Sequence, residues 1–146
     1  MAGISKFDKR MFAAARKIAK TSDFKNFHTG CVIVYKKRII GIGANSDKTH
    51  PMQAQYNKFR HFNKTKSGIK HSIHAEIAAI NSISYVMGRD IDWTKVKLYI
   101  YRICPGHESG QGLSKSCPAC QAAIQDLGIK HVYYTTDDGF AYEEFL

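Results

Sequence analysis

The sequence predicts an α/β fold in which helices cover both faces of a mixed β-sheet. Two β-branched runs flank "KKR" early in the chain, and strand-like runs alternate with helix-like runs later. Strands that alternate with helices pair in parallel, because each connection crosses the sheet, whereas the early runs form an antiparallel hairpin. The 146 residues fit one domain, which we expect to span residues 1–146.

The elements of the first half follow from the spacing of apolar residues. Residues 6–20 predict an amphipathic helix, because apolar positions recur at helical spacing between lysines and arginines. Residues 31–35 and 39–44 predict the two hairpin strands; their turn lacks Asn-Gly or Asp-Gly, so its type is open. Residues 45–73 show no clean period, and we expect a long loop with a short helix near "MQAQYNKF".

The second half alternates between helix and strand. In order, the expected elements are a buried helix at 74–85, a strand at 96–103, a loop rich in glycine and serine, a buried helix at 117–127 and a strand at 131–135. Gly128 suits the C-cap of the second of these helices. The last ten residues, "DDGFAYEEFL", predict a turn followed by a short helix or an edge strand.

Composition and charge narrow the class of protein. Apolar residues make up 44% and charged residues 23%, which is typical of a globular chain. No apolar run approaches the ~20 residues that cross a bilayer, and the N-terminus lacks a signal peptide's apolar core. We therefore expect a soluble, cytoplasmic protein with no membrane partner. The net charge of +10 favours an anionic partner such as nucleic acid, nucleotide or phosphate, although it can also serve solubility alone.

Two predicted helix openings bring together residue types that hold a catalytic metal. His74 and Cys117 each open a helix, and Cys117 and Cys120 share a helical face at i, i+3. A helix N-terminus lowers thiol pKa values, and zinc binds thiolates and imidazole. One histidine and two cysteines leave a fourth position for water, as in catalytic zinc sites. Glu76 follows closely enough to move that water's proton.

The cysteine pattern is also compatible with a redox role or a purely structural role. A C-x-x-C pair can be a redox motif, which would leave His74 and Glu76 without a function. "CPGH" at 104–107 and "CPAC" at 117–120 also have the spacing of a structural zinc site. A second, structural zinc on Cys104 and His107 is a further alternative. The helix predicted after "CPAC" favours the catalytic arrangement.

"HAE" at 74–76 and "SCPAC" at 116–120 resemble the paired motifs of the zinc-dependent cytidine and deoxycytidylate deaminase superfamily, most closely its deoxycytidylate branch. The resemblance runs from "TGCVIVYKKRIIGIGAN" to "GIKHVYYTT", which is most of the chain. It implies a cytidine-deaminase-like fold, a three-layer αβα sandwich with a mixed sheet. It also implies one catalytic zinc, bound by His74, Cys117 and Cys120, with Glu76 as the catalytic acid and base.

The resemblance further implies a reaction and its substrate contacts. A water activated by zinc attacks C4 of cytosine, and Glu76 passes a proton to N3 and then assists the loss of ammonia; adenine could react at C6 in the same way. "GIGAN" is similar to the family's G-x-G-x-N strand end, which implies a sugar contact for Asn45, although Asn45 could also cap a turn. Gly30, Cys31 and Ser116 are the other expected substrate contacts, although Cys31 could simply be a small buried residue.

The sequence departs from the family pattern at Ser116. Relatives usually carry proline directly before the first zinc cysteine, whereas here Pro118 follows Cys117. Pro118 falls near the first helical position, where proline is well tolerated, so we expect the zinc site to survive. The shape of the adjoining loop, and with it part of the substrate pocket, is expected to differ.

The segment 48–71 interleaves basic and aromatic residues and contains no acid. Such a pattern suits single-stranded nucleic acid, because cations follow phosphates and rings stack on bases. The expected phosphate or nucleic-acid contacts are Lys48, Tyr56, Lys58, Phe59, Arg60 and Lys64. The same basic residues could instead bind one 5′-phosphate or face a neighbouring subunit, and the aromatic residues could anchor a short helix.

These observations favour a zinc-dependent hydrolase that deaminates a free deoxycytidine nucleotide, with dCMP as the leading candidate substrate. The enzymatic alternative is a cytosine or adenine deaminase that acts on single-stranded DNA or RNA. The non-enzymatic alternative is a zinc-stabilised nucleic-acid-binding module, in which Glu76 would have no function. Members of the family that this chain resembles often assemble as dimers or larger, so a homo-oligomer is an open alternative to a monomer.

Overall fold

The computed structural model describes residues 4–24, 27–59, 72–84 and 90–145. The elements are α1 (Lys6–Ala19), β1 (His28–Tyr35), β2 (Arg38–Ala44), α2 (Pro51–Tyr56), α3 (Ala75–Asn81), β3 (Lys97–Ile103), β4 (Gln111–Gly112), α5 (Pro118–Leu127), β5 (His131–Thr135) and β6 (Phe140–Glu144). Short 3-10 turns lie at Asn57–Phe59 and Trp93–Lys95.

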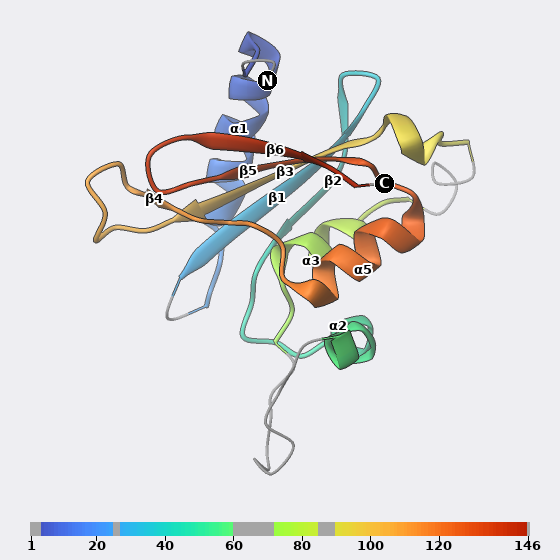
Figure 1. The fold of residues 1–146 in the computed structure, drawn as a ribbon. Coiled ribbons are helices and arrows are strands. Elements are labelled where there is room, and N and C mark those ends of the chain that lie inside the picture. The colour runs from blue at the N-terminus through green and yellow to red at the C-terminus, as the bar shows by residue number, and fades with distance from the viewer. Residues whose placement is uncertain (1–3, 25–26, 60–71, 85–89, 146) are drawn as a thin grey trace.

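A mixed sheet forms the middle layer, in the strand order β2-β1-β3-β5-β6, with β4 paired to β3. The β1–β2, β1–β3 and β5–β6 pairs are antiparallel and β3–β5 is parallel, because α5 carries the chain back between those two strands. Helix α1 covers one face of the sheet, and α3 and α5 cover the other (Figure 1). The predicted α/β sandwich with a mixed sheet is therefore confirmed.

Two cores lie on opposite faces of the sheet, and alternate residues of β1 contribute to each. Val32 and Val34 point toward α1 and pack with Phe12. Cys31 and Ile33 point the other way, into the core beneath α3 and α5. Because β1 is covered on both faces, it is a rigid platform for a site at its end.

The β1–β2 hairpin is confirmed, and its turn type is now defined. Lys36 and Lys37 have φ values of 51° and 64°. Left-handed backbone at both central residues is what a type I′ turn requires, and this turn matches the twist of paired strands. The usual Asn-Gly signal is absent, so the sequence pattern alone leaves the turn type open.

The end of one helix differs from the sequence expectation, and other elements refine it or agree with it. Helix α3 ends at Asn81, earlier than the expected residue 85, because the Ser82 hydroxyl donates to Ala79 O and accepts from Ile42 N. The expected short helix near 52–59 is α2 with its 3-10 extension. The chain closes with edge strand β6, and Gly128 (φ 92°) caps α5 as predicted. None of the described helices is long and apolar enough to span a membrane.

Candidate active site

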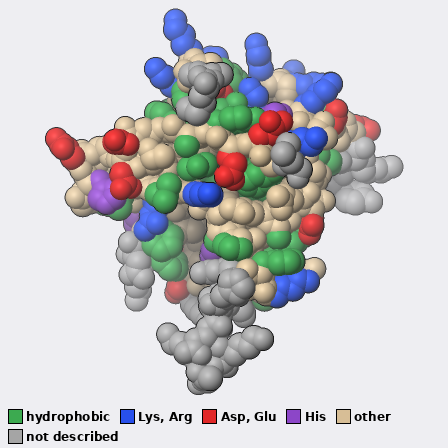
Figure 2. Space-filling view, viewed as in Figure 1, with side chains coloured by type: hydrophobic (Ala, Val, Ile, Leu, Met, Phe, Trp, Pro, Cys, Tyr) green, Lys and Arg blue, Asp and Glu red, His purple; other side chains and the backbone are tan. Residues whose placement is uncertain are grey.

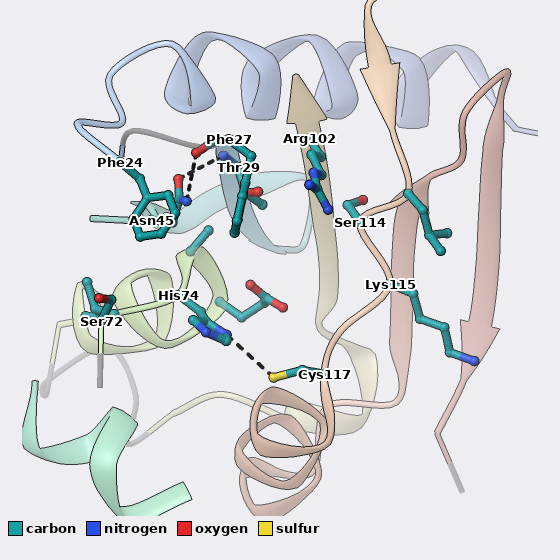
Figure 3. Close-up of a pocket in the computed structure, with 14 residues that line it drawn as sticks. Phe24, Phe27, Thr29, Asn45, Ser72, His74, Arg102, Ser114, Lys115 and Cys117 are labelled. Atoms are coloured by element: carbon teal, nitrogen blue, oxygen red, sulfur yellow. Dashed lines mark hydrogen bonds between the residues drawn. The ribbon is translucent and has the colours of Figure 1, made fainter. Parts of the chain in front are cut away.

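Two helix N-termini converge below the sheet and carry the predicted metal-binding side chains. His74 is the N-cap of α3 and Cys117 is the N-cap of α5. Both residues have extended backbone, and neither side chain caps its own helix. Pro118, at the start of α5, needs no hydrogen-bond acceptor there. Both side chains are therefore directed toward the space between the helices (Figure 3).

The three candidate ligand atoms have the spacing of a tetrahedral zinc site. His74 Nδ1 lies 3.5 Å from Cys117 Sγ and 3.3 Å from Cys120 Sγ. All three ligand atoms lie within 4.8 Å of one another. Ligands held about 2.0–2.3 Å from a tetrahedral zinc are roughly 3.5 Å apart, so this donor set fits zinc without rearrangement.

The electrostatics of the cluster favour thiolate at Cys117. A hydrogen bond from Cys120 and the neighbouring His74 lower the pKa of the Cys117 thiol to about 4, against the effect of burial. The same hydrogen bond, together with burial, raises the pKa of Cys120 well above its ordinary value. One thiolate is thus already favoured, and a cation would favour the second.

Glu76 lies on the first turn of α3, 5% exposed, in the wall of the pocket. Burial raises the pKa of this carboxyl group; His74 opposes the rise and Cys117 adds to it. The buried Ser116 hydroxyl lies beside the Glu76 carboxyl group and lowers its pKa, and among the described residues it has no other hydrogen-bond partner. A buried carboxyl group beside a metal-binding cluster, with its pKa raised by burial, is a candidate for both accepting and donating a proton.

A pocket of about 420 Å³ opens in front of these residues (Figure 3). Its apolar wall is formed by Phe24, Phe27, Ile73 and Leu113. Polar and charged side chains complete it: Thr29, Asn45, Ser72, His74, Glu76, Arg102, Ser114, Lys115 and Cys117. A concave pocket that combines an apolar wall with convergent polar groups beside a metal-binding cluster is suited to a small-molecule substrate.

Asn45 is buried at the pocket wall, where its amide holds the chain that leads into β1. Its Oδ1 accepts hydrogen bonds from Thr29 N (2.9 Å) and Ser22 Oγ (2.6 Å), and its Nδ2 donates to Phe27 O (3.1 Å). These hydrogen bonds are those of a residue that caps a turn, which is the alternative to a substrate contact. The sugar contact assigned to Asn45 stays a prediction.

Gly30 does not line the pocket, contrary to its assignment as a substrate contact. A Cβ on Gly30 would lie 2.2 Å from Ala15 O and 2.4 Å from Ala19 N, so this residue faces α1 on the other side of the sheet. Its role is to let the helix approach the strand. Cys31 is fully buried behind Glu76, and Ser116 is buried beside it; neither lines the pocket.

Part of the basic and aromatic segment has a structural role. The Tyr56 hydroxyl donates to Asp126 Oδ2 (2.7 Å) and joins α2 to α5. Phe59 is 45% exposed, with Lys58 Nζ 5.2 Å from its ring centre. Lys48 is exposed, and its carbonyl accepts from Ile73 N. Arg60 and Lys64 lie outside the described residues.

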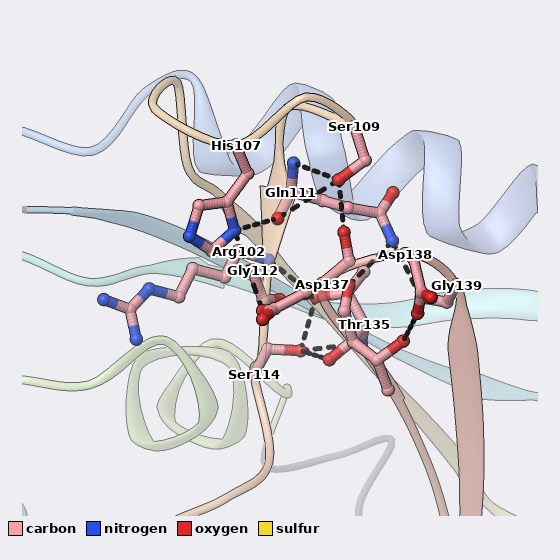
Figure 4. Close-up of polar contacts among 11 residues, drawn as sticks. Arg102, His107, Ser109, Gln111, Gly112, Ser114, Thr135, Asp137, Asp138 and Gly139 are labelled. Carbon is pink, nitrogen blue, oxygen red and sulfur yellow. Dashed lines mark hydrogen bonds and ion pairs between the residues drawn. The ribbon is translucent and has the colours of Figure 1, made fainter.

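Cys104 and His107 lie in the loop between β3 and β4, apart from the pocket. The backbone N–H of His107 donates to Cys104 O, and His107 Nδ1 lies 2.9 Å from Gln111 O and 3.7 Å from Asp137 Oδ1 (Figure 4). Within the described ranges, the only group of three or more clustered metal-binding side chains is that of His74. A second zinc at Cys104 and His107 stays a prediction.

Two residues of the site carry no signal in the sequence. Gln53 is fully buried on α2, and its Oε1 accepts from the backbone N–H of His74 (2.9 Å), which fixes the start of α3. Arg102 lies near the end of β3, inside the pocket. Neither residue belongs to a motif, and only the folded arrangement brings them to the site.

Comparisons with known proteins identify the family and the fold of the chain. The family model "Cytidine and deoxycytidylate deaminase zinc-binding region" matches residues 5–136. No curated protein sequence matches the chain. Among solved structures, dCMP deaminase from the cyanophage S-TIM5 is similar, with 22% identity, TM-score 0.54 and coverage of 88% of this chain and 81% of that one in its apo form.

Two further solved structures share the fold. The same cyanophage S-TIM5 enzyme in complex with dCMP and dUMP has 19% identity and a TM-score of 0.56, with coverage of 91% and 83%. Cytidine deaminase from Burkholderia pseudomallei has 13% identity and a TM-score of 0.57, with coverage of 93% and 91%. At these identities the likeness concerns the fold, whereas the family match covers most of the sequence. The chain therefore belongs to the zinc-binding cytidine and deoxycytidylate deaminase family.

Proposed function

We propose that this protein hydrolyses the exocyclic amine of cytosine in a free deoxycytidine nucleotide, dCMP, giving dUMP and ammonia. The observation that carries the proposal is the position of Glu76: a buried carboxyl group that shares one pocket wall with His74 and Cys117. The S-TIM5 structures, named as a dCMP deaminase with dCMP and dUMP, support this substrate.

The chain's own residues account for the proton transfers. Zinc held by His74, Cys117 and Cys120 would supply Lewis acidity that makes a water a better nucleophile. Glu76 would take the proton of the attacking water, deliver it to N3 of the ring and then assist the departure of ammonia. Burial of Glu76 keeps bulk water from competing for that proton.

The pocket wall suits a nucleotide. Phe24, Phe27 and Ile73 offer apolar surface for the base, while Thr29 and Ser114 offer hydroxyl groups in the lining of the cavity. Arg102 adds a positive charge within the same cavity. An apolar surface, hydroxyl groups and one cation match the base, sugar and phosphate of a nucleotide.

Cytosine within single-stranded nucleic acid is the second candidate substrate, and the surface charge favours it. Figure 2 shows lysine and arginine side chains gathered over the start of α1 and the β1–β2 hairpin. The exposed residues there include Lys6, Lys9 and Arg10 of α1 and Lys36, Lys37 and Arg38 of the hairpin. Positive charges on two separate elements can contact several phosphates of a nucleic-acid strand, whereas a free nucleotide offers only one phosphate group.

The deciding experiment measures product release by the zinc-loaded protein. We expect dCMP to be converted to dUMP, with less turnover of a single-stranded oligonucleotide at matched cytosine concentration. Glu76→Gln should lower kcat by about 10²–10⁴-fold, because the proton carrier is lost. Its zinc content should equal that of the wild type, since the three ligand side chains are intact.

Three outcomes would contradict parts of the proposal. Full turnover by Glu76→Gln would remove Glu76 from the mechanism. Turnover of the oligonucleotide alone would make the protein a polynucleotide deaminase. Absence of any deamination by the zinc-loaded protein would favour a binding module.

A further inference from the structure

Arg102 is a cation inside the pocket that has no anionic partner among the described residues. It is the penultimate residue of β3, and its side chain points from the sheet into the cavity (Figure 3). Its Nε is buried and has no hydrogen-bond partner within the described residues. No carboxylate in the described part of the chain forms an ion pair with it. Arg102 therefore has unused hydrogen-bonding capacity and an unpaired positive charge within the described residues, which an anion in the pocket would satisfy.

The guanidinium is held in place by stacking. Arg102 Cζ lies 4.4 Å from the centre of the Phe27 ring. A guanidinium that stacks on an aromatic face keeps its N–H groups directed outward in the plane of the group. Those groups can then form paired hydrogen bonds to two oxygens of one ligand group, the geometry that phosphate offers.

The backbone beneath Arg102 is fixed by a buried polar network (Figure 4). The N–H of Arg102 donates to Thr135 Oγ1 (3.2 Å), and Thr135 Oγ1 donates to Gly112 O (2.6 Å). Ser114 Oγ lies 2.8 Å from Thr135 Oγ1 and donates to Ile100 O (3.0 Å). The end of β3 and the loop that follows β4 thus form one rigid unit, and Arg102 is presented on it.

We infer that Arg102 binds the phosphate group of the substrate and makes this enzyme select a nucleotide over a nucleoside. The inference rests on the proposed function for the identity of the base, but the anion site itself stands on the geometry of Arg102 and Phe27. The ligand chemistry is a phosphate ester, which a free nucleotide or a nucleic-acid backbone could supply. We assign it to the 5′-phosphate of a free nucleotide, because Arg102 shares one bounded cavity with Glu76.

Lys115 provides a matched comparison. It also lines the pocket, but its Nζ lies 3.6 Å from Glu143 Oε2, and half of its side chain is exposed. Its charge is therefore already paired and solvated. If overall positive charge were enough for phosphate binding, neutralising Lys115 would matter as much as neutralising Arg102.

The experiment compares dCMP with deoxycytidine for the wild type, Arg102→Gln, Arg102→Lys and Lys115→Gln. Arg102→Gln should lower the ratio of kcat/KM for dCMP over deoxycytidine by roughly 10- to 100-fold, the effect of one charge-assisted hydrogen-bond pair. Arg102→Lys should recover part of the ratio, because it keeps the charge but not the paired geometry. Lys115→Gln should change the ratio by less than about threefold.

Binding of products provides a second readout that does not depend on turnover. In the Glu76→Gln background, Arg102→Gln should weaken binding of dUMP, measured by calorimetry, by a similar factor relative to deoxyuridine. A cytosine-containing oligonucleotide tested in parallel identifies the source of the phosphate. An Arg102 effect on the oligonucleotide alone would overturn the assignment to a free nucleotide.

The remaining outcomes separate this inference from the proposed function. If dCMP is deaminated but Arg102→Gln lowers activity on both substrates equally, the stacked arginine is only structural and the inference is wrong. An unchanged ratio in a folded variant, with Lys115→Gln lowering it instead, would also overturn the inference. If no substrate is deaminated but binding of dUMP still depends on Arg102, the proposed function fails and the anion site stands.

Discussion

At the scale of single residues, a buried ionic hydrogen bond joins α1 to the sheet. The Tyr99 hydroxyl, fully buried on β3, donates to Asp8 Oδ1 at 2.5 Å. Burial acts to raise the pKa of Asp8. The hydrogen bonds from Tyr99 and Ser5, together with the nearby charge of Lys97, outweigh it, so the pKa lies below its ordinary value. Asp8 also completes the capping box of α1 with Ser5, so one carboxylate serves both helix and sheet.

We expect Tyr99→Phe to destabilise the protein in a pH-dependent way. A carboxyl group whose pKa is lowered in the folded state contributes stability above its unfolded pKa, and this contribution is lost as pH falls through the folded pKa. The variant should therefore lose about 2 kcal/mol of unfolding free energy at pH 7. The loss should shrink as pH falls below the ordinary Asp pKa of about 4 and through the lowered pKa of Asp8. Urea unfolding at several pH values measures both.

Tyr101→Phe is the control for this prediction. Tyr101 lies on the same face of β3, and its hydroxyl is 3.3 Å from Gln111 Oε1, an amide that does not titrate. Tyr101→Phe should lose less unfolding free energy than Tyr99→Phe, and its loss should not depend on pH. A Tyr99→Phe penalty that stays constant from pH 7 to pH 3 would show that packing, and not the charge of Asp8, determines the effect.

The sequence predicts those site residues that lie close together in the chain and form a short motif. His74 and Glu76 share one helix start, and Cys117 and Cys120 share another, so short motifs predict these groups. Arg102 could not be predicted, because its partner Phe27 is about 75 positions away in the sequence and only strand pairing brings the two together. Gly30, an expected substrate contact, lies where a Cβ would face α1 and does not line the pocket, because a motif does not reveal which face of a strand a residue occupies.

At the scale of elements, the site depends on the close contact between α3 and β2. Gly43 faces this helix, and a Cβ there would lie 2.3 Å from Ala79 N and 2.7 Å from Ala75 O. These are backbone atoms of α3, which cannot move aside singly. The absence of a side chain at Gly43 therefore sets the distance of the helix that positions His74 and Glu76.

Gly43→Ala should displace α3 and so reduce both stability and activity. Overpacking of this kind costs about 1–3 kcal/mol of unfolding free energy. A displacement of catalytic groups by about 1 Å lowers kcat by up to about 10²-fold. Gly106→Ala is the control, because a Cβ at Gly106 would meet no atom within 4 Å. Unfolding curves measure the loss of stability, and turnover of dCMP measures the loss of activity. If Gly43→Ala and Gly106→Ala had the same stability and the same turnover, the packing argument would be refuted.

Element types could be predicted better than element ends. Runs of β-branched residues predict the main strands, and apolar residues at helical spacing predict helices, including the parallel return through α5. The end of α3 depends on the Ser82 hydroxyl and on Ile42, which lies far earlier in the chain, so no local pattern contains it. Strand β4 is only two residues long, so it carries no periodic signal.

At the scale of the whole molecule, the two helices that carry the site approach one another at their N-termini. His74 comes from α3, while Cys117 and Cys120 come from the start of α5. Around these residues lies a small core that includes Ile77 and Ala123. Zinc bound by all three ligands would therefore join two chain segments that lie far apart in the sequence, and stabilise the fold as well as the site.

Removal of zinc should consequently lower the thermal stability of the entire domain. A ligand present at about 1,000 times its Kd stabilises the native state by about 4 kcal/mol, which for a domain of this size corresponds to a shift in Tm of roughly 10 °C. Chelator should produce this shift in the wild type, measured by calorimetry with metal analysis of the same sample. His74→Ala should already melt at the lower temperature and should not respond to chelator. If His74→Ala kept its zinc, or if zinc-free wild type melted at the original temperature, the metal would not be shared by the two helices. Glu76→Gln should retain the full response, because Glu76 is not one of the three clustered metal-binding side chains and its replacement leaves the link between α3 and α5 intact.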